Sequence, residues 1–179
     1  SGTVIASLSI FADKGGIMGE KLTFDLQLNA AGQQFMQQLD ELCRLSVRVG
    51  FQAGDTEEDG TPLTNIAYWN EHGTMNKDGS VHSPARPFMH DSVQNNMEKI
   101  SDMCAAAAKQ VGTGNGSAQQ ALEGIGVKMV ALVQKEIRNG DFAANAPSTI
   151  RAKGSSKPLI DSGRMRQSVT FVIKEADKE

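Results

Sequence analysis

The sequence predicts an α+β fold in which an antiparallel sheet of three or more strands packs on two long antiparallel helices. Two long stretches have helical spacing of their apolar residues, and three short stretches alternate apolar with polar residues. The chain has 179 residues, of which 39% are hydrophobic and 22% charged. This composition and length are typical of one globular domain.

The first long helix is predicted to begin at Pro87, because proline suits the first helical position. Apolar residues then recur with helical spacing as far as Val111, and the glycine-rich stretch 112–117 ends the helix. A second long helix carries apolar residues from Ala121 to Ile137 and ends at Gly140. The short connection favours antiparallel packing of the two helices.

The predicted strands cover 22–28, 45–51 and 169–173, where alternate residues are apolar. Between the first two strands, Asn29 is a suitable N-cap for a helix whose apolar residues continue to Cys43. A short helix is predicted at 64–72, and a turn or short helix at 147–150. One face of the sheet should pack on the helix pair.

The domain organisation that we predict is an N-terminal arm, residues 1–20, followed by a single α+β domain, residues 21–179. Val4–Phe11 can form a strand, but the glycines after it separate it from the next one. Residues 52–63 form a polar, acidic loop. We expect both segments to be assembly elements that are mobile in the isolated protein, because neither can offset its ordering entropy alone. A neighbouring subunit can accept residues 4–11 along a sheet edge.

Charge and composition argue against several classes of protein. The formal net charge of −3 and the pI of about 5.6 provide no general attraction to nucleic acid or anionic membranes. No run of 18 apolar residues is present to span a bilayer, and we expect no secretory signal from the first residues. Cys43 and Cys104 fall on apolar faces of predicted helices, so we expect buried, reduced thiols in a cytoplasmic protein.

The sequence contains no recognisable catalytic or metal-binding pattern. His72, His82 and His90 do not have the spacing of metal ligands, and the glycines of 15–21 lack the order of a phosphate-binding loop. Ser162-Gly163 lacks the preceding glycine of a nucleophile elbow. We therefore expect no catalytic, cofactor or metal site and no enzymatic activity. An enzyme accessory or unrecognised hydrolase is a third hypothesis.

One basic cluster surrounds Asp161 and provides candidate phosphate or partner contacts. Its members are Arg151, Lys153, Lys157, Arg164 and Arg166. A small nucleic-acid-binding protein that uses this cluster is thus an alternative function. Aromatic residues make up only 5% of the chain, which disfavours a stacking platform for single strands.

Three segments together form a specific pattern. They are Tyr68–Thr74, Ser83–Phe88 and Lys153–Met165, with a predicted helix pair between the second and the third and a strand after the last. Over residues 45 to 175 the chain resembles the neck or tail-completion proteins of tailed phages and prophages, which include virion morphogenesis and minor tail proteins. The motif residues are Glu71, Gly73, Thr74, Pro84, Arg86, Pro87, Phe88, Pro158, Leu159, Asp161 and Gly163. The N-terminal arm and the acidic loop depart from the family pattern.

The resemblance implies a non-enzymatic virion structural protein that assembles as a homo-oligomeric ring at the neck. Its implied partners are connector or portal-side proteins and tail-tube proteins, with DNA only as passing genome, no membrane and no cofactor. The implied location is the virion, and the host cytoplasm during assembly. Physically, we expect Gly73 and Gly163 to have unusual backbone angles and Arg86 to pair with an acidic residue such as Glu71.

Overall fold

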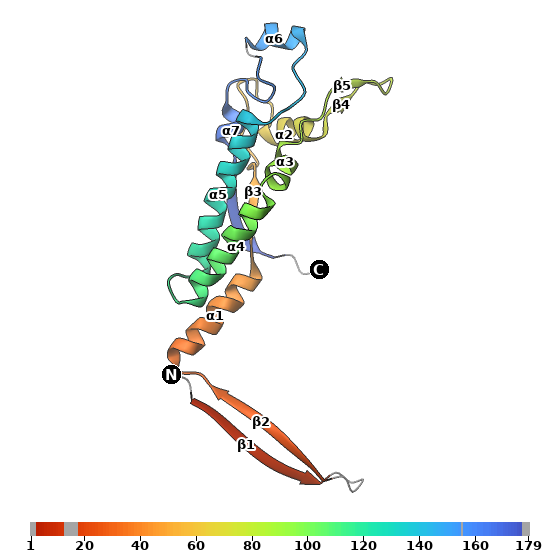
Figure 1. Ribbon diagram of the computed structural model, residues 1–179. Helices are drawn as coiled ribbons and strands as arrows, with labels where there is room; N and C mark the ends of the chain where they lie inside the picture. Colours follow the sequence, from red (N-terminus) through yellow and green to blue (C-terminus); the bar gives the residue numbers. More distant parts are fainter. Residues whose placement is uncertain (1–2, 13–17, 155, 177–179) are drawn as a thin grey trace.

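The computed structural model describes residues 3–12, 18–154 and 156–176, with side chains from residue 28 onwards except at 152 and 153. The molecule is elongated (Figure 1). A β-hairpin lies at one end, helix α1 connects it to a body of helices and strands, and helix α6 lies at the other end.

The body is built on two long helices, α4 (Met97–Gly112) and α5 (Ala118–Asn139). They lie side by side and run in opposite directions, which confirms the predicted antiparallel pair (Figure 1). Ser117 caps α5, since its hydroxyl accepts a hydrogen bond from the Gln120 N–H and the Gln120 side chain returns one to the Ser117 N–H. Helix α1 (Ala30–Arg44) packs against both, and Asn29 caps it as predicted.

The first predicted long helix is interrupted. Helix α3 (Phe88–Gln94) ends before Asn95 and Asn96, and α4 begins at Met97. The Asn96 side-chain amide donates to the Ser92 carbonyl at 2.9 Å, in competition with the helical backbone bonds. Pro87 is the N-cap rather than the first helical residue. The prediction of one continuous helix from Pro87 is therefore wrong, because two adjacent asparagines break it.

Strands β3 (Leu45–Gly50) and β6 (Thr170–Glu175) form an antiparallel pair, with Val47 opposite Ile173 and Val49 opposite Phe171. β3 follows α1 without a linker. Helix α5 packs on both strands. Phe171 lies against Gly126 of α5, where a Cβ atom would collide with the ring, so the glycine allows close packing of helix and sheet.

The predicted sheet of three or more strands is not found in the part of the chain that the structure describes. Each described sheet has two strands. The reason is that β2 (Met18–Gln27), which contains most of the predicted strand 22–28, pairs with β1 (Thr3–Ala12) instead of with β3. The described structure is thus α+β, with small separate sheets.

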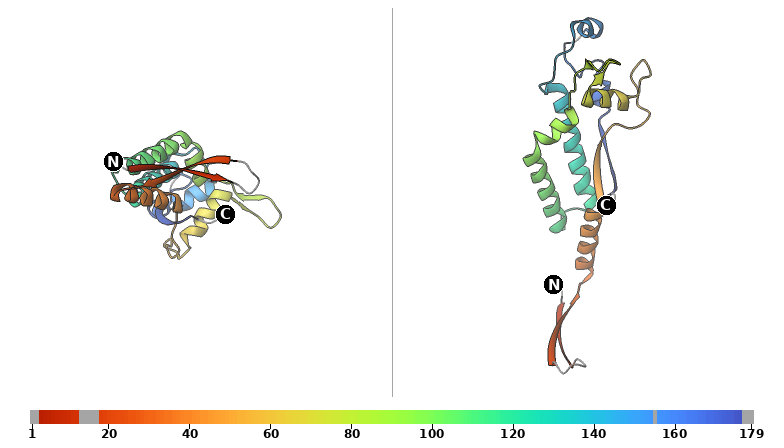
Figure 2. Two further views of the ribbon diagram at one scale, coloured as in Figure 1. Left: turned by 90° about the horizontal axis from the view of Figure 1, so that it is seen from below. Right: turned by 90° about the vertical axis from the view of Figure 1, so that its right-hand side faces the viewer.

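The end of the body opposite α1 carries the shorter elements. Helix α2 (Leu63–His72) is followed by a hairpin of β4 (Thr74–Met75) and β5 (Val81–Ser83), and α6 (Pro147–Lys153) and α7 (Arg164–Gln167) come after α5. The right-hand view of Figure 2 shows these elements gathered around the end of α5. The main core lies here and contains Leu63, Ala67, Phe88, Val133, Ile137, Leu159, Met165 and Val169.

Both cysteines are exposed, so the prediction of buried thiols is wrong. Cys43 lies in the last turn of α1, and Cys104, in α4, lines an open groove. Among the described residues, no helix is long and apolar enough to cross a membrane.

Gly73 has a φ of +73°, which confirms the expected unusual backbone angle. Residues other than glycine rarely adopt this conformation. A Cβ atom there would lie 2.8 Å from the Ser83 carbonyl oxygen and the Ala85 nitrogen. We expect Gly73→Ala to lower the free energy of unfolding by about 2–4 kcal/mol, from backbone strain and collision together. Urea unfolding measures this change.

Gly79 provides the matched control, because it has a φ of +84° but open space around its Cβ position. Gly79→Ala should cost only the strain, about 1 kcal/mol. Equal losses for the two variants would show that close approach at Gly73 does not matter.

Candidate functional site

Glu71 holds the start of α3. Its two carboxylate oxygens accept hydrogen bonds from the backbone N–H groups of Met89 and His90, at 2.9 and 3.0 Å. These N–H groups belong to the first turn of α3, which has no intrahelical acceptor for them. A carboxylate also suits the positive end of the helix dipole. Glu71 at the end of α2 thereby fastens α2 to α3.

Arg86 is a buried charged residue, with 5% of its surface exposed. Its Nε donates to the Ala143 carbonyl at 2.9 Å, and Nη2 donates to the Ala144 carbonyl at 3.4 Å and to Asn145 Oδ1 at 3.2 Å. Burial lowers the pKa of the Arg86 guanidinium. The predicted pairing with Glu71 is wrong, because Glu71 caps α3 while Arg86 points to the segment after α5.

Asn145 connects Arg86 to the third motif segment. It is 7% exposed, and its side-chain amide donates to the Lys157 carbonyl at 3.2 Å. Sequence reasoning missed Asn145, since a lone asparagine in a loop of small residues carries no periodic signal. The Arg86 backbone N–H in turn donates to the Asn70 carbonyl. We call Arg86, Asn145 and these carbonyls the Arg86 network; it joins all three motif segments.

The remaining motif residues have structural positions. Phe88 and Leu159 lie in the core, and Phe51 packs edge-on against Phe88. Gly163 has a φ of +84° and precedes α7, which confirms the expected unusual backbone angle. Thr74 pairs with Ser83 in the β4–β5 hairpin. Pro84 is exposed, Pro158 half-buried and Asp161 exposed.

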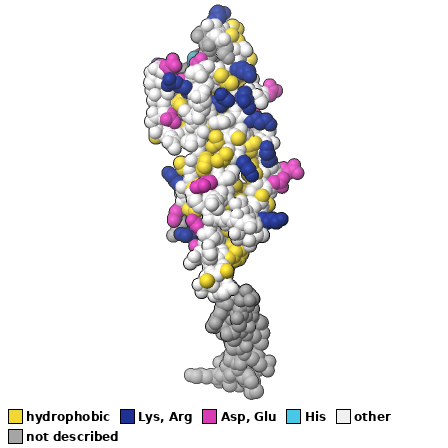
Figure 3. All heavy atoms as spheres, turned by 90° about the vertical axis from the view of Figure 1, so that its left-hand side faces the viewer, with side chains coloured by type: hydrophobic (Ala, Val, Ile, Leu, Met, Phe, Trp, Pro, Cys, Tyr) yellow, Lys and Arg dark blue, Asp and Glu magenta, His cyan; other side chains and the backbone are white. Residues whose placement is uncertain are grey.

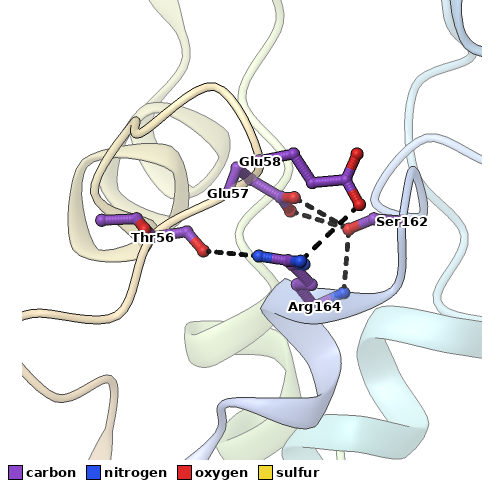
Figure 4. Close-up of polar contacts among 5 residues, drawn as sticks. All are labelled: Thr56, Glu57, Glu58, Ser162 and Arg164. Carbon is purple, nitrogen blue, oxygen red and sulfur yellow. Dashed lines mark hydrogen bonds and ion pairs between the residues drawn. The ribbon is translucent and has the colours of Figure 1, made fainter.

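The acidic loop is fastened to the third motif segment (Figure 4). The Ser162 hydroxyl donates to the Glu57 carboxylate at 2.9–3.0 Å, and Arg164 forms an ion pair with Glu58 at 3.6 Å. Within the loop, hydrogen bonds from Thr61 lower the pKa of Asp59. The loop therefore has partners within its own chain, which the sequence did not predict.

A cavity of about 680 Å³ lies between the acidic loop, α2 and the third motif segment. Its apolar lining includes Trp69, Ile66 and Leu159. Its charged lining is acidic and consists of Glu57, Glu58, Asp59 and Asp161. An acidic lining repels phosphate groups, so this cavity does not suit a nucleotide or a nucleic-acid backbone.

The residues of the basic cluster differ in their exposure and in their contacts. Arg164 is engaged with the acidic loop, Arg166 is half-buried in α7, and Arg151 and Lys157 are exposed. The Lys153 side chain lies outside the described residues. Figure 3 shows Lys and Arg side chains spread over one face, with Asp and Glu side chains among them. The structure therefore does not single out a phosphate-binding surface.

The three histidines are exposed and lie in α2, β5 and α3. Among the residues that the structure describes, no group of three or more His, Cys, Asp or Glu side chains could hold a metal ion. Comparisons with protein families, curated proteins and solved structures find nothing that matches this chain.

Removing the Arg86 side chain tests the network. Arg86→Ala would leave Asn145 and two carbonyls without their donors, and we expect the free energy of unfolding to fall by about 3 kcal/mol. Arg86→Lys should recover only part of this loss, because an ammonium group cannot reach the same oxygens as the guanidinium fork. Urea unfolding measures both.

Arg151→Ala is the control, since Arg151 is exposed in α6 and should change stability by less than about 0.5 kcal/mol. A loss for Arg86→Ala no greater than for Arg151→Ala would contradict a stabilising role of the Arg86 network.

Proposed function

We propose that this protein is a non-enzymatic structural component of a tailed-phage or prophage virion, that it acts in head–tail joining or tail completion, and that its copies assemble as a ring at the neck. The ring lies between connector or portal-side proteins and tail-tube proteins, in contact with DNA only as the genome passes. A head-to-tail contact whose rotation closes makes such a ring.

The observation that supports this proposal is the convergence of the three motif segments. The third segment is separated from the first two by α4 and α5, yet the Glu71 cap and the Arg86 network bring all three together at one end of the body. The motif residues that these contacts use hold the backbone in place and keep α2, α3 and the third segment in a fixed arrangement. Motif residues that hold the backbone are what we expect if this chain has the same scaffold as the neck or tail-completion proteins whose pattern it resembles.

Nucleic-acid binding through the basic cluster has less support. Arg164 is bound to Glu58 and to the Thr56 carbonyl, and the adjoining cavity has an acidic lining. The overall charge of −3 also gives no net attraction to phosphates. Salt-dependent retention of DNA by the purified protein would favour this alternative.

The test is deletion of the gene from the phage or prophage that encodes it. Particles made without the protein should be incomplete, with DNA-filled heads and free tails that electron microscopy can count. Mass spectrometry of purified wild-type particles should detect the protein at several copies. Infectious, complete particles from the deletion strain would overturn the proposal.

Complementation provides the matched controls. The wild-type gene and a triple variant with His72→Ala, His82→Ala and His90→Ala should both restore joined particles, because the three side chains are exposed and we assign them no metal or catalytic task. Rescue by the wild type but not by the triple variant would contradict a scaffold role without histidine chemistry.

A further inference from the structure

An apolar groove of about 410 Å³ runs along the body between β3 and helices α3 and α4, with α5 as its floor. In the right-hand view of Figure 2, α4 and β3 stand on either side of α5. Its lining residues that are only partly buried include Val47, Met89, Val93, Ile100, Ile125 and Met129. The exposed thiol of Cys104 also lines it. The groove is thus an apolar surface that the described body leaves uncovered.

One strand edge borders this groove. β3 pairs with β6 on one side only, and no other described strand pairs with it. The side chains of Val47 and Val49 line the groove, whereas Arg48, at the alternate position of the strand, is exposed. A strand added at the free edge of β3 would therefore need one apolar face toward α4 and one polar face toward solvent.

The β1–β2 hairpin has this two-faced pattern in its register. Apolar residues are paired at alternate positions, Val4 with Leu26, Ala6 with Phe24 and Leu8 with Leu22. The other face is the more polar of the two: it carries Ser7 with Thr23 and Ser9 with Lys21, beside Ile5 with Asp25 and Phe11 with Gly19. Since alternate positions of a strand share one face, the six apolar positions belong to the same face of the hairpin.

The hairpin extends beyond α1, away from the body (Figures 1 and 2). A two-stranded hairpin alone in water is marginally stable at best, so this one needs a further surface to pack against. Its connection to α1 is short, and Asn29 there caps α1 with a hydrogen bond to the Gly32 N–H. Gln38 of α1 in turn accepts from the Ala118 N–H of α5. These contacts fix α1 on the body, and the hairpin continues from the end of α1 that lies farthest from it.

We propose that the β1–β2 hairpin of a second copy of this chain docks along the free edge of β3 and covers the apolar groove. The hairpin's apolar face lies against α3, α4 and α5, and its polar face continues the exposed face of β3 and β6. The contact is head-to-tail, because each chain gives its hairpin to one neighbour and accepts one from another. The inference rests on the proposed function for its setting, a ring of like subunits.

The native thiol in the groove allows a direct test with full-length chains. Two differently tagged versions are co-expressed, both with Cys43→Ser. The first also carries Cys104→Ser and Leu8→Cys, and the second keeps Cys104. A short bifunctional thiol reagent should link the two versions to each other, since the thiol introduced by Leu8→Cys belongs to the apolar face of the hairpin.

Ser9→Cys in place of Leu8→Cys is the matched control, because the neighbouring position belongs to the other face. It should give much less product between the chains. Equal products from the two positions, or none from either, would overturn the proposal. A single chain with Leu8→Cys and Cys104 that links only within itself would also overturn it, by showing that the hairpin folds back on its own body.

A second measurement changes the groove and leaves the hairpin intact. Val93 lines the groove and is 41% exposed, whereas Val127 lies in α5 outside the groove and is 60% exposed. Val93→Asp should weaken self-association at least about tenfold in sedimentation velocity, because a carboxylate would enter an apolar contact. Val127→Asp should not. Circular dichroism melts check that both variants fold, and equal effects on self-association would contradict docking in the groove.

These measurements use purified protein and separate the two proposals. If the Leu8→Cys cross-link forms but the protein is absent from particles, the virion function is overturned and the hairpin contact stands. A protein present in particles that shows no product specific to Leu8→Cys would keep the virion function and overturn the hairpin contact.

Discussion

The arrangement of the body depends on the hydrogen bonds that the buried guanidinium of Arg86 donates. A charged group that is nearly inaccessible to water needs several acceptors, and here the acceptors come from the segment after α5. Those oxygens are backbone carbonyls and an amide. The guanidinium therefore orders a loop that has little apolar surface of its own. Through Asn145 the same group also holds the backbone at Lys157, where the third motif segment begins its turn.

Glu71, in the last turn of α2, completes this arrangement. Its carboxylate accepts hydrogen bonds from two N–H groups at the start of α3. Phe88, in the same turn, is buried in the core and holds the turn by packing. Helix α3 is short, and its position is set by this cap, by the packing of Phe88 and by the Arg86 network just before it. The acidic loop then packs against a turn that is already held, with Ser162 and Arg164 as its contacts.

Much of the fold could be predicted because it depends on local patterns. The periodicity of α5, the cap at Asn29 and the alternation in β3 and β6 are all properties of neighbouring residues. The pairing of strands is different, because β2 has the same alternating pattern whether it joins β3 or β1. The break at Asn95 and Asn96 could not be predicted from periodicity, because the apolar residues on either side keep helical spacing. Asn145 could not be found, since its importance comes from Arg86, 59 residues away in the sequence.

Helix α1 acts as a spacer. Its 15 residues correspond to a rod of about 22 Å, and Leu45 of β3 follows its last residue directly. Leu39 and Leu42, in the later turns of the rod, pack on α4 and α5. Because the rod is joined to the strand without a flexible linker, the turns before these residues set the distance between the hairpin and the body. In an assembly whose subunits contact one another through the hairpin, this length would determine the distance between the bodies of neighbouring subunits. A subunit with one more helical turn would reach about 5 Å farther and would fit a wider assembly.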